Sequence, residues 1–136
     1  MHPQVSDLGS LISDYGVVVK VKVCGITAYE DAALALDAGA DALGFNFYPR
    51  SPRYIRPADA RSILRRLPPL AVPVGLFVNV ADPEEVVGTA RQSGVRVLQL
   101  HGDEAPEYCA KLAEWPVIKA VRVGLGGLPA GVGASR

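Results

Sequence analysis

The sequence predicts an α/β fold in which five parallel β-strands alternate with four helices along one chain. Five apolar runs rich in β-branched residues recur at intervals of about twenty to thirty residues, which is the length of a βα unit. The segments between them carry apolar residues at helical spacing. Unbroken alternation of this kind indicates a parallel sheet with right-handed crossovers. The predicted strands are Val17–Val23, Ala42–Tyr48, Val72–Val78, Val95–Leu100 and Val117–Val123.

The first two predicted helices have recognisable ends. Thr27 and Glu30 fit a capping box, in which two side chains accept hydrogen bonds from free N–H groups at a helix start. Gly39 suits the residue that follows a last helical turn. Pro57 suits the first position of the second helix. That helix continues with apolar residues at helical spacing, namely Ala60, Ile63, Leu64 and Leu67.

The third helix is predicted to begin at Asp82, which is followed by Pro83 and two glutamates. A carboxylate at this position can accept from the free N–H groups, and acidic residues complement the positive end of the helix dipole. Gly94 predicts its end. The fourth helix is expected to run from Pro106 to Glu114.

One domain is predicted over residues 17–123, because 136 residues suit a single hydrophobic core. Residues 1–16 are expected to be an irregular N-terminal extension. Residues 124–136 hold five glycines and a proline, which predicts a disordered Gly-rich tail.

Composition excludes several functional classes. Fourteen basic and fourteen acidic residues give a formal net charge of +0, which does not favour nucleic acid or a membrane surface as partner. Two cysteines without metal-ligand spacing argue against a disulfide framework and against a zinc site. The first eighteen residues do not have the pattern of a signal peptide. A reducing cytoplasm is therefore the expected location.

Two residues follow predicted strands at the end where chemistry collects in parallel α/β folds. Cys24 comes directly after the first strand, and His101 comes directly after the fourth, with Gln99 on the same face of that strand. A buried strand that carries Gln and His on one face indicates a polar barrel mouth at this end of the sheet. The alternatives are a small buried thiol for Cys24 and a hydrogen-bonded structural histidine for His101.

Two arginines, Arg50 and Arg53, lie in a loop that Pro49 and Pro52 stiffen. The planar guanidinium fork suits a carboxylate or a phosphate. The alternative is that both arginines are solvated loop charges.

Other polar or reactive residues are interpreted as structural. Asn79 is expected to be a turn residue. Asp103 and Glu104 could act as acids, but the interpretation favoured is stabilisation of the next helix through its dipole. Cys109 and Trp115 are expected to pack in the core.

Six blocks of this sequence together resemble phosphoribosylanthranilate isomerase, a tryptophan-pathway family. They occur in the same order and at natural spacing from residue 22 to residue 121, which makes the resemblance specific. The blocks are Lys22–Thr27, Gly39–Phe45, Phe47–Ile55, Val74–Asn79, Leu98–Gly102 and Val117–Val121.

The resemblance implies a (β/α)₈ TIM barrel without a cofactor or a metal. It implies an Amadori rearrangement of N-(5-phosphoribosyl)anthranilate to carboxyphenylamino-deoxyribulose phosphate, a small phosphorylated sugar–anthranilate substrate. In the family an aspartate acts as general acid and a cysteine thiolate removes the C2′ proton. By this resemblance Cys24 is the general base, Arg53 binds the anthranilate carboxylate, and His101 contacts the substrate.

The chain also departs from the family pattern. A TIM barrel needs at least about 200 residues, whereas five strands and four helices are predicted here, so the expected fold is a partial, truncated barrel. The family's catalytic aspartate follows strand 6, and its phosphate site lies after strands 7 and 8. We therefore expect very low turnover from this stretch alone. The alternative function is an inactive barrel fragment that folds, or that self-associates through open sheet edges.

Overall fold

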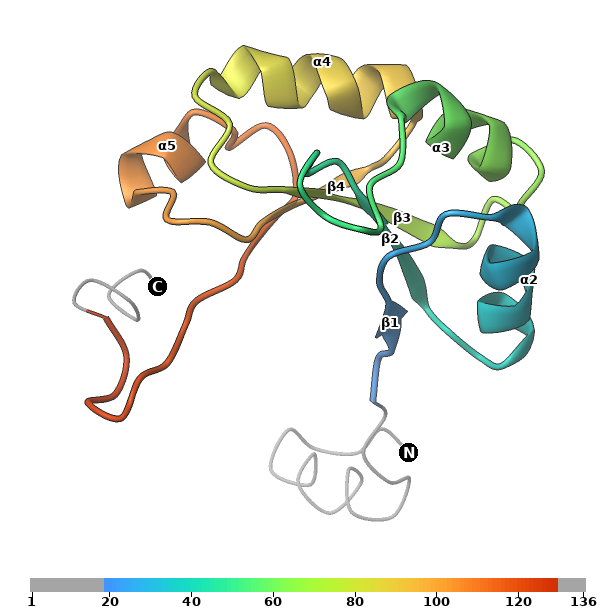
Figure 1. Cartoon of the computed structure of the whole chain (residues 1–136), viewed down its shortest axis with the longest axis horizontal. Helices are drawn as coiled ribbons and strands as arrows, with labels where there is room; N and C mark the ends of the chain where they lie inside the picture. The colour runs from blue at the N-terminus through green and yellow to red at the C-terminus, as the bar shows by residue number, and fades with distance from the viewer. Residues whose placement is uncertain (1–18, 130–136) are drawn as a thin grey trace, which may run out of the picture.

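The computed structural model describes residues 19–129, which form one parallel sheet with helices on its outer side (Figure 1). The strand order is β1-β2-β3-β4-β5, so neighbours in sequence are neighbours in the sheet. The predicted five-stranded parallel α/β fold is therefore confirmed. The strands are β1 (Lys22–Val23), β2 (Ala42–Asn46), β3 (Val72–Phe77), β4 (Val97–Leu100) and β5 (Val117–Lys119). The helices are α2 (Tyr29–Asp37), α3 (Pro57–Leu64), α4 (Pro83–Ser93) and α5 (Pro106–Ala110).

The strand β1 is shorter than predicted, and hydrogen bonding explains its start. The Val21 backbone N–H donates to the Asp41 carboxylate at 2.8 Å, so this group is bound by a side chain and not by the neighbouring strand. Regular pairing begins with Lys22 opposite Ala42. Residues 17 and 18 of the predicted strand lie outside the described residues.

The strand β5 also ends earlier than predicted, because its neighbour ends. It pairs with β4 up to Lys119 opposite Leu100, which is the last residue of β4. The Ala120 N–H still donates to the Leu100 carbonyl at 2.9 Å. Residues 121–123 have no β4 residue opposite them and leave the sheet.

The predicted capping box at the start of α2 is wrong. The residue at the cap position is Ala28, and it makes no side-chain cap hydrogen bond. The backbone N–H groups of Gly25 and Ile26 both donate to the Gly44 carbonyl at 3.0 Å, which ties the preceding loop to β2. The loop before α2 is therefore held by backbone hydrogen bonds to β2, and Thr27 is not the cap residue.

The helix α5 is also shorter than predicted, since it ends at Ala110 and not at Glu114. The following N–H groups of Lys111 and Leu112 donate three residues back, to Tyr108 and Cys109. This spacing forms tight turns in place of a continued α-helix.

The predicted start of α3 and the glycine ends of α2 and α4 are confirmed, whereas α3 ends at Leu64 and so does not include Leu67. Pro57 occupies the first turn of α3, and Gly39 and Gly94 have the positive φ angles of 100° and 88° that favour glycine after a helix. The Asp82 Oδ1 accepts from the Glu84 N–H at 2.9 Å, so the predicted cap of α4 is present.

Replacing Asp82 by Ala is expected to lower the free energy of unfolding by about 1 kcal/mol, because the Glu84 N–H loses its acceptor. Urea unfolding of the purified chain measures the loss. Asp82→Asn is the matched control, since asparagine keeps an acceptor at the same place. Equal losses in the two variants would contradict the capping role.

The two faces of the sheet differ in what they contact. Alternate residues of the central strands, such as Phe45, Leu98 and Leu100, are fully buried in the core beneath the helices. Cys109 and Trp115 are partly buried against this core, as predicted. Side chains alternate along a strand, so the neighbours of these buried strand residues point to the opposite face of the sheet. We call this face, which the helices do not cover, the concave face.

The remaining predictions concern the ends of the chain. The predicted extension of residues 1–16 lies outside the described residues, as do residues 130–136 of the tail. The described part of the tail contains a turn in which the Gly127 N–H donates to the Gly124 carbonyl at 3.0 Å. Among the helices of residues 19–129, none has the length and apolar character needed to cross a membrane.

Candidate active site at the C-terminal ends of the strands

Cys24 lies directly after β1 with its thiol against β2. It is half-buried and is not part of a disulfide. A Cβ atom at Gly44 would lie 2.8 Å from the Cys24 Sγ, closer than real Cβ contacts come. The thiol therefore occupies space that only glycine at position 44 leaves open. This requirement was missed from sequence, where Gly44 is only one small residue in an apolar strand.

Arg53 lies in the loop between β2 and α3, and its side chain covers Gly25. A Cβ atom at Gly25 would lie 3.0 Å from the Arg53 Nη1, and Gly25 has a φ angle of 82°. The structure thus brings the guanidinium beside the residue that follows Cys24. The contact depends on a glycine at this position for two reasons, the backbone angle and the space that a side chain would take.

The loop that carries Arg53 is held by side-chain hydrogen bonds as well as by its prolines. The Ser51 Oγ accepts from the Arg53 N–H at 3.1 Å and from the Asn46 Nδ2 at 3.0 Å. The Asn46 Oδ1 accepts from the Tyr48 N–H at 2.9 Å. Asn46 is the last residue of β2, so these bonds fix the loop to the strand end.

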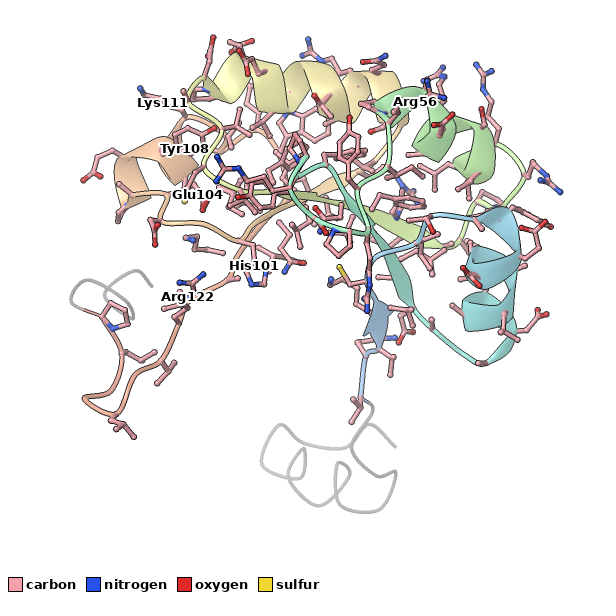
Figure 2. All side chains as sticks on the ribbon, in the orientation of Figure 1. Arg56, His101, Glu104, Tyr108, Lys111 and Arg122 are labelled. Carbon is pink, nitrogen blue, oxygen red and sulfur yellow. The ribbon has the colours of Figure 1, made fainter. Side chains whose placement is uncertain are left out.

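His101 follows β4, and its exposed imidazole extends from the side of the sheet opposite the helices (Figure 2). Its backbone N–H donates to the Phe77 carbonyl at 2.9 Å, which holds the strand end against β3. Since β1 and β4 are parallel members of one sheet, Cys24 and His101 lie at the same end of it. The prediction that Cys24 and His101 lie at the C-terminal strand ends agrees with this arrangement, and Arg53 lies in the loop that follows the same end of β2.

A partly buried ion pair connects three strand ends and was missed from sequence. The side chain of Glu104 is 2% exposed, and its Oε1 lies 3.0 Å from the Nζ of Lys119. The Lys119 Nζ also donates to the Gly102 and Ala120 carbonyls at 2.6 and 2.9 Å. The interpretation that Glu104 serves the helix dipole is therefore wrong, because its carboxylate is bound within the loops.

The same carboxylate organises the neighbouring loops. The Glu104 Oε2 accepts from the Asn79 N–H at 2.9 Å, and Oε1 accepts from the Gly102 N–H at 2.9 Å. Asn79 has a φ angle of 50°, so it is the predicted turn residue, and its Oδ1 accepts from the Asp103 N–H at 2.7 Å. The sequence did offer one signal of this ion pair, namely Lys119 at the end of an apolar strand. A buried lysine needs a partner of opposite charge.

Burial by itself would raise the pKa of Glu104, but the hydrogen bonds from Asn79, Lys119 and Gly102 outweigh it and hold the pKa below its usual 4.5. The folded protein therefore binds this proton more weakly than the unfolded chain does. The resulting stabilisation is present above the unfolded pKa and is lost as the pH falls through the folded one.

We expect the free energy of unfolding to decrease more steeply below about pH 4.5 in the native chain than in Glu104→Gln. Urea unfolding across acidic pH measures both slopes. The exposed Asp41 also has a lowered pKa, first because it accepts from the Val21 N–H, so Asp41→Asn serves as the comparison variant. Identical slopes for the native chain and Glu104→Gln would contradict this assignment.

A cavity of about 210 Å³ lies on the side of the sheet that the helices cover. Phe47 and Phe77 of the helix-side core line it, together with Glu85 and Thr89 of α4. It is separate from the concave face that carries His101. Within residues 19–129, no group of three or more His, Cys, Asp or Glu side chains is placed to hold a metal ion.

Comparison with known proteins agrees with this arrangement. Residues 21–126 match the family model for N-(5'phosphoribosyl)anthranilate (PRA) isomerase. The chain belongs to the PRA isomerase family. The matched segment contains every strand and helix described above.

Comparison with individual PRA isomerases shows what share of a family member this chain covers. The protein of Trichlorobacter lovleyi is 55% identical over 106 residues, which are 78% of this chain and 51% of that protein. The Thermotoga maritima protein is 51% identical over 107 residues, and its crystal structure superposes with a TM-score of 0.74 over 76% of this chain and 51% of the other. The chain thus spans about half the length of the curated relatives that it matches.

A second PRA isomerase structure, in complex with reduced 1-(o-carboxyphenylamino)-1-deoxyribulose 5-phosphate, is 51% identical with a TM-score of 0.76. It covers 79% of this chain and 55% of the other. The five strands and four helices are therefore part of a TIM-barrel fold, and the sheet formed by residues 19–129 is not closed.

Proposed function

We propose that this chain carries the first half of the active site of a phosphoribosylanthranilate isomerase. The reaction would be the Amadori rearrangement of N-(5-phosphoribosyl)anthranilate, an aldose-to-ketose isomerisation in tryptophan biosynthesis. The observation that supports it is the Cys24 thiol at a strand end with the Arg53 guanidinium against the adjoining Gly25.

In the proposed mechanism the Cys24 thiolate is the general base that removes the C2′ proton of the ring-opened substrate. Arg53 binds the anthranilate carboxylate through its planar fork, which orients the attached sugar relative to the thiolate. His101 contacts the same substrate from β4. Family resemblance assigns the general acid to an aspartate after a sixth strand, so this acid belongs to the half of the relatives that the chain does not match.

The test supplies that other half. The chain is assayed alone and after residues 1–126 are joined to the part of the Thermotoga maritima relative that follows its matched segment. Chromatographic separation of the aldose and ketose isomers measures turnover. We expect turnover from the joined protein and little from the chain alone, since acid–base groups contribute about 10²–10⁴-fold each. A folded joined protein without turnover would contradict the proposal.

A second candidate function is association without turnover, and the sheet edges favour it. Among residues 19–129, β1 and β5 each pair with one strand, which leaves their other edges open. Ile118 of β5 is 45% exposed. Sedimentation at micromolar concentration should reveal oligomers, and Ile118→Lys should reduce them. Leu34→Lys on the exposed face of α2 is the matched control, and an equal reduction there would contradict an edge-specific contact.

The proposal includes residues 17–123 as the folded unit and the cytoplasm as its location. Both cysteines, Cys24 and Cys109, are free, as suits a reducing compartment. The balanced charge of +0 gives no reason to expect nucleic acid or a membrane as partner.

A further inference from the structure

Gln99 is a polar residue buried on the concave face. It is the third residue of β4, between Leu98 and Leu100, which are both buried beneath the helices. Alternation along the strand therefore directs Gln99 to the same face as His101. In the ladder it lies opposite Leu76 on one side and Ile118 on the other, yet it is only 8% exposed. An amide buried between apolar neighbours needs a hydrogen-bond partner.

The side-chain amide of Gln99 has one hydrogen-bond partner among the described residues, and that partner is His101. The Gln99 Nε2 lies 3.4 Å from the His101 Nδ1. The Gln99 Oε1 is buried and has no partner in the described part of the chain. With the amide in this orientation its nitrogen donates, and the Nδ1 that it faces accepts. A neutral imidazole that accepts at Nδ1 carries its proton on Nε2.

The rest of His101 is already fixed. Its backbone N–H is bound to the Phe77 carbonyl, and the next residue, Gly102, donates to the Glu104 carboxylate. These bonds hold the backbone of His101 but do not orient its imidazole ring. Among the described residues, the side chain that hydrogen-bonds to this ring is Gln99. In a neutral histidine, the hydrogen bond made by one ring nitrogen sets whether the proton lies on that nitrogen or on the other.

We propose that Gln99 is a positioning residue that holds His101 as the Nε2–H tautomer, so that this histidine offers a hydrogen-bond donor to an oxygen of the ligand. The inference rests on the proposed function for the identity of that ligand, a phosphorylated sugar joined to an aromatic carboxylate. The tautomer itself is a property of the chain without ligand. Measurement on the free protein therefore tests it separately from turnover.

The experiment uses ¹⁵N NMR of the imidazole rings in the full chain at about pH 8.5, well above the reference range in which model imidazoles take up a second proton. The chain has two histidines, so His2→Ala assigns the His101 signals. We expect Nε2 to give the protonated signal and Nδ1 the unprotonated one. A protonated Nδ1 in the native chain would overturn the proposal without the need for any further variant.

Two substitutions test the part played by Gln99. Gln99→Glu places an acceptor beside Nδ1 and should reverse the two ¹⁵N shifts. Gln99→Leu should bring them closer together, because the two tautomers then exchange freely. Gln92→Leu, at an exposed glutamine of α4, is the matched control and should leave both shifts unchanged. Shifts in a folded Gln99→Leu protein that equal those of the native chain would overturn the proposal.

Discussion

Replacing Cys24 by Ala is expected to lower kcat by about 10²–10⁴-fold in the joined protein, because the variant lacks the thiol that we propose as the general base. KM should change little, since in the proposed mechanism the carboxylate of the substrate is bound by Arg53 and not by the thiol. The effect follows from the position of the thiol at the end of β1, where it fills the space above Gly44. Steady-state kinetics measure both constants.

The second cysteine provides the control for this experiment. Cys109 is half-buried in α5 and packs against the helix-side core. Cys109→Ala should therefore reduce stability slightly and leave kcat within a few-fold of the native value. If Cys24→Ala retained native kcat, the thiol would not be the base.

Replacing Lys119 by Met should give the largest loss of stability, about 2–4 kcal/mol in the free energy of unfolding. Removal of one partner of a fully buried ion pair costs about 3–5 kcal/mol because an uncompensated charge remains. The Glu104 side chain is 2% exposed and that of Lys119 27%, so solvent reduces the expected loss here. Urea unfolding at neutral pH measures it.

An exposed ion pair of the same protein is the comparison. Lys20 lies 3.5 Å from Asp41, and their side chains are 77% and 38% exposed. Lys20→Met should change stability by less than about 0.5 kcal/mol, as is usual for exposed pairs. The double variant Lys119→Met with Glu104→Gln should recover part of the loss, because no charge then stays buried. Equal losses for Lys119→Met and Lys20→Met would show that the Glu104 pair does not stabilise the loops.

The sequence by itself determined the fold class, the order of the elements and the residues at the strand ends. These features depend on short-range signals. The apolar runs predict strands, Pro57 and Asp82 mark helix starts, and Gly39 and Gly94 mark helix ends with the positive φ angles that glycine tolerates. Because parallel strands place their C-terminal ends together, the position of Cys24 and His101 at one end of the sheet also followed.

Only the tertiary structure decided how these residues are held. The Glu104 carboxylate binds the Asn79 N–H from 25 residues away and the Lys119 ammonium from 15 residues away. The thiol of Cys24 requires the absence of a side chain at Gly44, and the loop before α2 is tied to the carbonyl of Gly44, a residue about twenty positions further along the chain. Such contacts join residues that are distant in the chain, and no local periodicity or capping pattern encodes which of them meet when the sheet forms.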